Sequence, residues 1–445
     1  MADRSLNTFE LFMTMIATNF SAFFFLGFAS EGYSKGYAYY AMVAFGTSFA
    51  SITFYLIGQK ALSYGKSKNY VTPVELVGGL TQHLPTKYAL MIVYLLFIFP
   101  YLALQPIGAG LILENLTDGA IPFFAGVCGM ILFIIAHILV GGMKGVVLLD
   151  VKNGILMLSL MILAVVAIVF QLGGLEQINE HILTNKPAIY SPRGVSDHFT
   201  PKKWISYMIL FNFSIAILPQ LFMRFMISKS SLQLQRSTLL YSIIPIFLFL
   251  LPVLIGISGH LTEPSLEGKE ADKILSLMLV EHTPKWFAAI VLTGALAAFV
   301  STMDSLLLSL GTIFSRDFLQ SLSANKKIDE VKYAKISIVV FALITLCIAQ
   351  IKPASIFALG KLTLSAMATL FPVMLLILRW NKLKPIFYFL AIVLSEALLV
   401  GVSFSWIKLP LFDGFLPVVP SFCLCIFILI IGAIFSRNLL PTEFD

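Results

Sequence analysis

The chain has 445 residues, of which 58% are hydrophobic and only 12% are charged. Soluble globular proteins carry about 25% charged and roughly 45–50% apolar residues, so this composition excludes a soluble fold of this size. The net charge of +7 does not indicate nucleic-acid binding, because the Lys and Arg residues form no groove-sized cluster. Composition therefore predicts a polytopic membrane protein, in which the position of each charge matters more than the total.

Long apolar runs recur along the chain. Each has about 18–28 residues, enough for a helix to cross a hydrocarbon layer of about 30 Å. Continuous apolarity, without alternation at a period of two, favours helices over barrel strands. We expect an all-helical fold with about twelve transmembrane helices, joined by loops of which the longest are 171–203 and 259–286. The predicted spans are approximately 9–28, 37–59, 87–111, 120–140, 142–170, 204–227, 236–258, 287–315, 333–351, 353–378, 384–407 and 416–436.

The charge of the loops predicts the orientation. With a cytoplasmic N-terminus, the inner loops and adjoining helix ends carry about 18 of the 30 Lys and Arg residues. The outer connections carry about 10, mostly in the two long loops, which count least under the positive-inside rule. We therefore expect a multi-pass protein of the cell (inner) membrane with both termini in the cytoplasm. The inner segments would be 60–86, 141–146, 228–236, 316–332, 379–384 and the tail.

The apolar run 287–315 contains the richest set of polar residues. Two adjacent hydroxyls, the Asp304 carboxylate and accessible carbonyls are hard oxygen ligands, which alkali and alkaline-earth cations prefer. The alternative is that the hydroxyls bond back to their own helix, but this does not account for Asp304. On a helix, four positions share one face: Ala298, Ser301, Thr302 and Ser305.

A second intramembrane carboxylate, Asp150, follows a glycine-rich stretch and precedes Asn153 by one helical turn. It is either an interfacial carboxylate solvated at a helix end or a second cation contact facing the helix at 287–315. Lys361, Glu396 and His137 also lie in apolar runs. Each could make an interhelical contact, and Lys361 could instead act as a counter-ion for a solute.

The tripeptide Asn-Phe-Ser occurs in mid-span at 19–21 and again at 212–214, five predicted helices apart. Transporters with inverted repeats interrupt the first helix of each half near the membrane midplane, where free carbonyls bind ions and substrates. Pro219 supplies a helix breaker in the later segment. The earlier segment has no Pro or Gly before Gly27, so propensity does not reveal a break there.

Several motifs together resemble the sodium/solute symporter family, closest to its proline and pantothenate branch. The most specific are the run from Ala298 to Asp317 and the Pro-Gln to Arg-Phe-Met run at 219–226. Supporting matches are 70–75 and the stretch from Gly141 to Asn153, and the resemblance covers about residues 4–380. Family members usually begin with an additional helix. Here 4–6 resembles the linker after that helix, so either the helix is lost or the start is misassigned.

The resemblance implies an inverted five-plus-five repeat. The first five-helix unit would be 1–170, the second 171–378, and 379–445 would hold two peripheral helices with the tail. It also implies a sodium site formed by the carbonyls of Ala17, Phe20 and Ala298 with the hydroxyls of Ser301 and Thr302.

A second cation site, present in some members, would map to Asp150, Ser301, Asp304 and Ser305. Some members have a hydroxyl at the place of Asp304, which leaves sodium stoichiometry or a proton role open. The solute would bind near a set of polar and aromatic residues: Asn19, Phe23, Tyr101, Gln105, Phe211, Asn212 and Ile215.

The expected function is sodium-coupled import of a small organic solute by alternating access. Sugar carriers of the family have Glu-Gln where this chain has Phe23-Phe24, which disfavours sugars. An amino acid, pantothenate or a monocarboxylate fits better. The alternatives are a proton-coupled carrier on the same fold and a solute sensor without transport. We expect no enzyme, because no nucleophile–base pair or metal cluster lies in the spans, and no nucleic acid or obligatory protein partner.

Overall fold

The computed structural model describes residues 6–263, 265–322 and 329–436, with side chains described outside 141–148. Within these ranges, ten helices are long and apolar enough to cross a membrane, and two further pairs of helices are each bent at a short break. If each bent pair is one span, the total is twelve. The predicted all-helical fold is therefore confirmed, with ten to twelve candidate spans among the described residues. Part of the charge counted for the inner loops, at 323–328 and 437–445, lies outside the described residues, as do residues 4 and 5 of the presumed linker.

The helices of the first half run nearly end to end. They are α1 (Thr8–Asn19), η1 (Phe23–Gly27), α2 (Phe28–Lys35), α3 (Tyr37–Ser48), α4 (Ala50–Lys68), α5 (Pro73–Thr81), α6 (Leu84–Leu116), α7 (Phe123–Gln171) and α8 (Gly174–Asn185). The next group is η2 (Pro187–Tyr190), η3 (Val195–Asp197), α9 (Pro201–Ser214), η4 (Ile215–Ile217), α10 (Pro219–Met226) and α11 (Ser231–Ser258).

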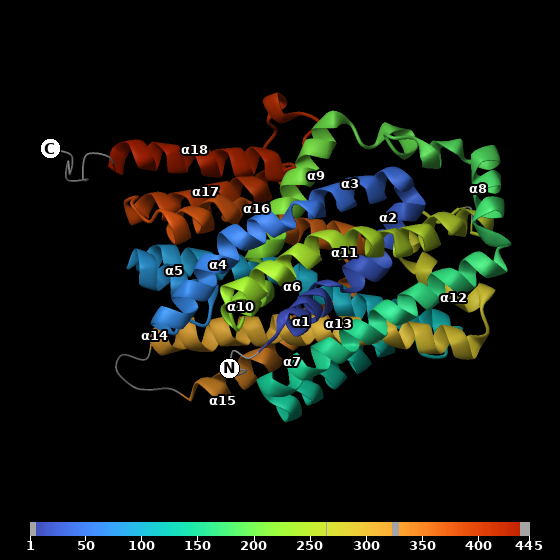
Figure 1. Cartoon of the computed structure of the whole chain (residues 1–445), viewed down its shortest axis with the longest axis horizontal. Coiled ribbons are helices and arrows are strands. Elements are labelled where there is room, and N and C mark those ends of the chain that lie inside the picture. Colours follow the sequence, from blue (N-terminus) through green and yellow to red (C-terminus); the bar gives the residue numbers. More distant parts are fainter. Residues whose placement is uncertain (1–5, 264, 323–328, 437–445) are drawn as a thin grey trace.

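The remaining helices complete the bundle. They are η5 (Gly259–Leu261), η6 (Gly268–Lys273), α12 (Ile274–His282), α13 (Lys285–Thr312), η7 (Ile313–Leu319), α14 (Gln320–Leu322), α15 (Glu330–Ile351), α16 (Ile356–Arg379), α17 (Pro385–Ser403), η8 (Pro410–Phe412) and α18 (Val418–Ser436). Most long helices lie roughly along the long axis, with α5 and α14 at one end and α8 and α12 at the other (Figure 1). We call these the α5 end and the α8 end.

The structure corrects the prediction for three connections. The long loops expected at 171–203 and 259–286 contain the helices α8 and α12. In α8, Ile178 and Ile182 are one turn apart and both are buried, so this helix is held by an apolar face. Residues 141–146, expected as a loop, fall within α7, whose limits enclose two candidate spans, 123–140 and 149–171. This stretch contains no proline, so no backbone donor is missing from it.

The first span is interrupted between α1 and η1, where the chain bends by 66°. Phe20 adopts an extended conformation there, and the lost helical bonds are replaced by side chains. The amide of Ala22 donates to Oε1 of Gln105 at 3.0 Å, and the amide of Phe23 donates to Oγ of Ser21 at 3.1 Å. The break therefore depends on tertiary partners, which explains why helix propensity did not reveal it.

The sixth span is interrupted between η4 and α10, with a bend of 52°. Pro219 begins α10, as its lack of an amide hydrogen predicts. The carbonyl of Ile217, just before the break, accepts a hydrogen bond from the hydroxyl of Tyr94 at 2.9 Å. Both breaks are thus supported by side chains of one helix, α6, which also packs against α7, α13 and α16.

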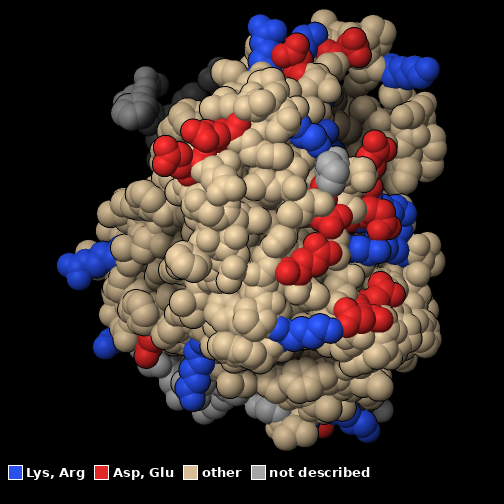
Figure 2. All heavy atoms as spheres, turned by 90° about the vertical axis from the view of Figure 1, so that its right-hand side faces the viewer, with Lys and Arg blue, Asp and Glu red and all other residues tan. Residues whose placement is uncertain are grey.

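Charged side chains of both signs are interspersed over the α8 end, which faces the viewer in Figure 2. The flanks of the bundle carry many exposed apolar side chains, including Phe124, Leu132 and Phe170. A charged end and apolar flanks are the distribution expected when helix ends meet water and helix sides meet lipid.

Close packing of α2 against α11 requires a glycine. A Cβ atom built on Gly256 would lie 2.0 Å from the carbonyl oxygen of Ala29, which is a backbone atom that cannot move aside. We predict that Gly256→Ala lowers the free energy of unfolding by about 1–3 kcal/mol, because the two helices are forced apart. The measurement is thermal unfolding of the purified protein in detergent.

Gly129 in α7 is the matched control, because a Cβ there would meet nothing within 4 Å. Gly129→Ala should leave the melting temperature unchanged or raise it slightly through helix propensity. Equal melting temperatures for the two variants would contradict the close approach of α2 and α11.

Candidate ion and solute site

A small cavity lies at the centre of the bundle, beside both helix breaks. Its volume is about 30 Å³, enough for a few water molecules at most. Five of the seven predicted solute contacts line it, and Gln105 and Asn212 are outside the lining. The full lining is Asn19, Phe20, Phe23, Phe24, Phe28, Val43, Thr47, Tyr101, Phe211, Ile215, Phe249 and Leu364.

The wall of this cavity is dominated by aromatic rings. Phe23 stacks on Phe357 with ring centroids 5.3 Å apart, and Phe20 stacks on Phe24 at 4.3 Å. The polar groups among the lining residues are few, and one of them, the side-chain amide of Asn19, donates to the hydroxyl of Tyr241 at 2.5 Å. A bound solute would therefore meet mostly apolar surface and would have to displace phenylalanine side chains.

The last turn of α1 meets α13 next to this cavity. The hydroxyl of Thr302 donates to the carbonyl oxygen of Ala17 at 3.4 Å, and both residues are fully buried. The final carbonyls of a helix lack intrahelical donors, so this end of α1 has acceptors to offer. The five residues predicted to bind sodium are all at most 1% exposed at this contact: Ala17, Phe20, Ala298, Ser301 and Thr302.

Asp150 of α7 lies behind the α1–α13 contact. Its carboxylate accepts a hydrogen bond from the Ser301 hydroxyl at 2.6 Å and forms an ion pair with Arg224 of α10 at 2.6 Å. The same guanidinium donates to the Ser305 hydroxyl at 2.9 Å. Asp150 is completely buried, so it is a paired charge in the protein interior and not an interfacial carboxylate.

Asp304 has a different partner. One of its carboxylate oxygens lies 2.5 Å from Nδ1 of His137 in α7, and the other is buried without a hydrogen bond among the described residues. The residues grouped in sequence as a possible second cation site therefore divide between two counter-cations, Arg224 and His137. No group of three or more His, Cys, Asp or Glu side chains in the described ranges could hold a metal ion.

Arg224 is the main site residue to which sequence reasoning gave no role. It appeared only as one letter of the 219–226 motif, although an arginine inside an apolar run requires a partner. That signal pointed to an intramembrane carboxylate, and Asp150 was already known as one. What the sequence could not provide was the choice between Asp150 and Asp304.

The comparison with protein families decides the class. The model of the sodium:solute symporter family matches residues 1–385.

This chain belongs to the sodium:solute symporter family. It is therefore a membrane transporter of the symporter type and not an enzyme, as the resemblance of its motifs implied.

Curated relatives of this family member are pantothenate carriers. The sodium/pantothenate symporter of Haemophilus influenzae is 25% identical over 393 residues, covering 85% of this chain and 78% of the relative. The sodium/pantothenate symporter of Escherichia coli is 23% identical over 442 residues, covering 98% of this chain and 90% of the relative.

Solved structures of sodium- and cation-coupled transporters share the fold. A substrate-bound, outward-open Na⁺-coupled sialic acid symporter aligns with a TM-score of 0.80 at 18% identity, over 99% of this chain and 91% of that one. Mhp1, a nucleobase-cation-symport-1 family transporter in a closed conformation, aligns with a TM-score of 0.69 at 12% identity, over 99% of this chain and 94% of that one.

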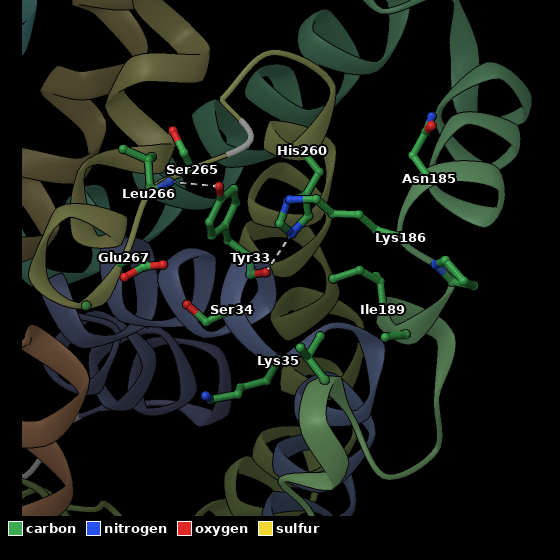
Figure 3. A pocket seen from close by; sticks show the side chains of 14 residues that line it. Tyr33, Ser34, Lys35, Asn185, Lys186, Ile189, His260, Ser265, Leu266 and Glu267 are labelled. Atoms are coloured by element: carbon green, nitrogen blue, oxygen red, sulfur yellow. Dashed lines mark hydrogen bonds between the residues drawn. The ribbon is translucent and has the colours of Figure 1, made fainter.

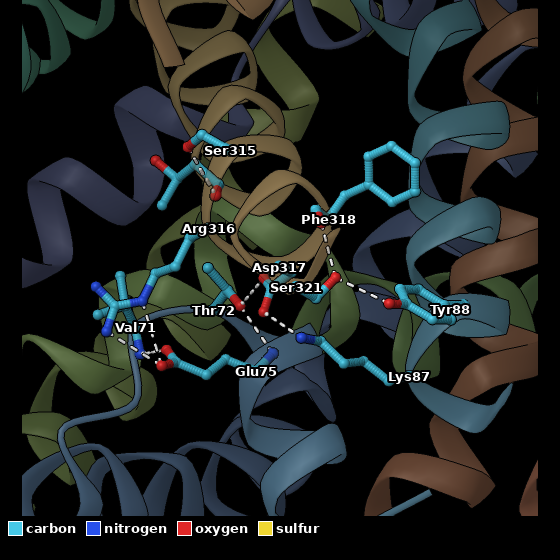
Figure 4. A network of polar contacts seen from close by, with 11 residues as sticks. Val71, Thr72, Glu75, Lys87, Tyr88, Ser315, Arg316, Asp317, Phe318 and Ser321 are labelled. Carbon is cyan, nitrogen blue, oxygen red and sulfur yellow. Dashed lines mark hydrogen bonds and ion pairs between the residues drawn. The ribbon is translucent and has the colours of Figure 1, made fainter. Parts of the chain in front are cut away.

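A second polar network lies at the α5 end of this symporter and joins two of the family motifs (Figure 4). Asp317 of η7, only 1% exposed, accepts a hydrogen bond from Thr72 at 2.6 Å and pairs with Lys87 at 3.4 Å. Its neighbour Arg316 pairs with Glu75 at 3.1 Å. The motif at 70–75 and the end of the motif from Ala298 to Asp317 are therefore joined at this end of the bundle.

Removal of Arg224 should destabilise the protein strongly, because it leaves the Asp150 carboxylate buried without a counter-charge. We predict that Arg224→Gln lowers the free energy of unfolding by about 3–5 kcal/mol. The double variant Asp150→Asn/Arg224→Gln should recover part of this loss, since both charges are then absent. Melting temperatures in detergent test this, with the exposed Arg236→Gln as the control. A double variant no more stable than Arg224→Gln would argue against the pair.

Asp317 should contribute more to stability than its exposed neighbour in the network. Asp317→Asn replaces one of the two carboxylate oxygens, which face Thr72 and Lys87, by an NH₂ group that can only donate. We expect the free energy of unfolding to fall by about 1–3 kcal/mol. Glu330 is 44% exposed and lies 3.5 Å from Arg316, so Glu330→Gln should change stability by less than about 1 kcal/mol. Thermal unfolding of the two variants side by side provides the comparison, and equal losses would refute the difference.

Proposed function

We propose that this family member is a sodium-coupled secondary active symporter that imports a small organic solute by alternating access. The observation that carries the proposal is the contact between Thr302 of α13 and the free carbonyl of Ala17 at the interrupted first span. This contact supports the proposal because it brings one hydroxyl and one carbonyl oxygen from two helices together close to the central cavity. An ion bound there would join the two helices and the solute pocket.

The proposed sodium ligands are the carbonyls of Ala17, Phe20 and Ala298 and the hydroxyls of Ser301 and Thr302. Hard oxygen ligands without a formal charge suit an ion that has to be released again in each cycle. The Ser301 hydroxyl donates a hydrogen bond to the Asp150 carboxylate, so the lone pairs of the Ser301 oxygen stay free for a cation. Asp150 would thus support the site from behind without binding the ion.

The pairing of Asp150 with Arg224 favours a single sodium site. A cation between Asp150 and Ser305 would lie beside a guanidinium that already contacts both residues at 2.6 and 2.9 Å. Asp304, Asp150 and Ser305 are therefore assigned here to charge pairing and not to a second sodium. Proton coupling is the second candidate, and the His137–Asp304 contact is the observation in its favour. Uptake measured against pH at fixed sodium distinguishes the two.

The solute is proposed to be small and partly apolar, as an amino acid, pantothenate or a monocarboxylate is. Support comes from the phenylalanine-rich cavity and from the names of the two pantothenate symporters among the relatives. The contacts nearest to a bound solute would be Asn19, Phe23, Tyr101, Phe211 and Ile215, while Gln105 would act by holding the helix break.

We also propose the five-plus-five organisation, with units at 1–170 and 171–378 followed by 379–445. The support is that the two bent spans are the first and the sixth in chain order. Placing the α5 end in the cytoplasm of a bacterial inner membrane, with both termini inside, follows from the loop charges. In the proposed cycle, sodium and solute bind from the α8 end, each more tightly in the presence of the other, and leave at the α5 end.

Loss of a proposed ligand should weaken sodium binding. Thr302→Val removes the hydroxyl at nearly constant volume, and we expect the sodium concentration for half-maximal uptake to rise roughly tenfold or more. Uptake is measured in proteoliposomes with and without a sodium gradient, using radiolabelled pantothenate as the first solute. Ser309→Ala is the matched control, because Ser309 is buried in the same helix but its hydroxyl bonds only to the carbonyl of Ser305. Unchanged sodium dependence in Thr302→Val would refute the site.

The sensor alternative makes a different prediction. A protein that binds solute without transport would bind pantothenate or another solute in the presence of sodium, but vesicles would show no accumulation under a sodium gradient. Accumulation that collapses when the gradient is dissipated would exclude the sensor.

A further inference from the structure

The central cavity has no charged side chain in its lining, although several of the expected solutes are acids. The nearest source of positive charge along α16 is Lys361, in the second turn of that helix. Leu364, one turn deeper, lines the cavity, and Phe357, one turn before it, stacks on the cavity residue Phe23. Residues three and four apart share a helix face, so Lys361 lies on the face that α16 turns toward the cavity.

The contact of α16 with the cavity wall is very close at this point. The ring of Phe23 lies against the backbone of Gly360, where a Cβ atom would be 2.3 Å from the ring. Phe357 also contacts the ring of Tyr39 at 5.5 Å and that of Tyr207 at 6.3 Å. These rings pack together against the first turns of α16, next to Gly360, which directly precedes Lys361 in the chain.

Three lysines from three helices, α2, α9 and α16, act electrostatically on one histidine, His198. Burial, followed by the positive charges of Lys35, Lys203 and Lys361, lowers the pKa of His198 to about 4. The ammonium of Lys203 lies 3.4 Å from Nδ1 of this imidazole. Glu31 of α2 is the acidic residue whose charge acts on Lys361, whereas Lys35 and Lys203 repel it. The group formed by Lys35, Lys203, Lys361 and Glu31 therefore has an excess of positive charge.

Lys361 and Glu31 differ from Asp150 and Asp304 and resemble Glu396 of α17, whose buried carboxylate also lacks a hydrogen bond among the described residues. Asp150 is paired with Arg224, and Asp304 with His137, each at hydrogen-bonding distance. Neither the ammonium of Lys361 nor the carboxylate of Glu31 makes a hydrogen bond or close ion pair with any residue that the structure describes. An intramembrane charge of this kind is costly and marks a ligand pathway in most transporters.

The lysine group connects to a larger pocket at the α8 end. That pocket has a volume of about 700 Å³, and Lys35, Lys186 and His260 are among its lining residues. Figure 3 shows Lys35 extending away from Lys186 and His260, on the side of the pocket formed by α2. An anion entering from this end would meet positive charge first at the pocket and then at the group that contains Lys361.

We propose that Lys361 is the specificity-determining cation of this symporter and binds the carboxylate of an organic acid as the acid enters the central cavity. The carboxylate takes the place of Glu31 as the counter-charge of Lys361, while the apolar part of the solute displaces the phenylalanine rings below. The proposal deepens the proposed symport function and rests on it, since it names the chemical class of the solute.

The test compares acids with uncharged counterparts of nearly the same shape. The pairs are pantothenate with panthenol, L-proline with L-prolinamide, and L-lactate with L-lactamide. Binding is measured as the ligand concentration that gives half of the maximal thermal stabilisation in sodium chloride. We expect at least one acid to bind about tenfold or more tightly than its counterpart. The acid can accept a charge-assisted hydrogen bond from Lys361 that the uncharged counterpart cannot match, and such a bond accounts for about a tenfold difference in affinity.

Substitution of Lys361 should remove this preference. In Lys361→Gln and Lys361→Met the affinity for the acid should fall about tenfold to a hundredfold, while that for the uncharged counterpart stays within about threefold. Lys361→Arg should retain the preference. Glu31→Gln should shift affinity in the opposite direction, because the solute then has no competitor for Lys361. Lys202→Gln is the control, since Lys202 is exposed and donates to the carbonyl of Asp413 at 2.7 Å.

Three results would overturn the proposal. The first is an acid preference that persists in both Lys361→Gln and Lys361→Met. The second is equal affinity of the native protein for the acids and for their uncharged counterparts. The third is that no acid in the set stabilises the native protein. Repeating the measurement in choline chloride separates this proposal from the symport function. Acid binding that depends on Lys361 but is equal without sodium would remove sodium coupling and leave the role of Lys361 intact.

Discussion

Backbone amides and carbonyls inside a bilayer need partners within the protein, and two interrupted spans leave several of them unpaired. In this transporter α6 supplies those partners. Gln105 accepts from the amide of Ala22 in the first break, and Tyr94 donates to the carbonyl of Ile217 before the second. These bonds allow the last carbonyls of α1 to face α13, so the proposed ion site and the central cavity both depend on one continuous helix.

The overall architecture could be predicted from the sequence because lipid imposes a simple rule on composition. Twelve apolar runs of sufficient length gave twelve spans, and Pro219 marked the second break directly. The first break was invisible because Phe20 and Ala22 are compatible with a helix, and their open conformation is stabilised by the remote side chain of Gln105 together with the local hydroxyl of Ser21. The helices α8 and α12 were missed because short segments with mixed polarity resemble loops until a neighbouring surface buries one face.

The sequence selected the candidate residues of the site but could not indicate how they pair. Ser301, Thr302 and Asp150 were selected because polar groups in apolar runs are rare. Which carboxylate would meet which cation depends on how α7, α10 and α13 pack, and no spacing along the chain encodes it. The structure pairs Asp150 with Arg224, and this pairing is the observation behind the proposal of a single sodium site.

The glycine contact between α2 and α11 has a mechanical consequence. Because the absence of a side chain at Gly256 lets the backbone of α11 approach that of Ala29 in α2, a movement of one helix would be passed directly to the other. The segment α1 lies on the far side of the 66° bend and also contacts α11 directly, where the side-chain amide of Asn19 donates to the hydroxyl of Tyr241. A change in the angle between α1 and α2 would therefore act on residues 20–22, where the side chain of Gln105 holds the break, and would also shift the contacts of α1 with α11.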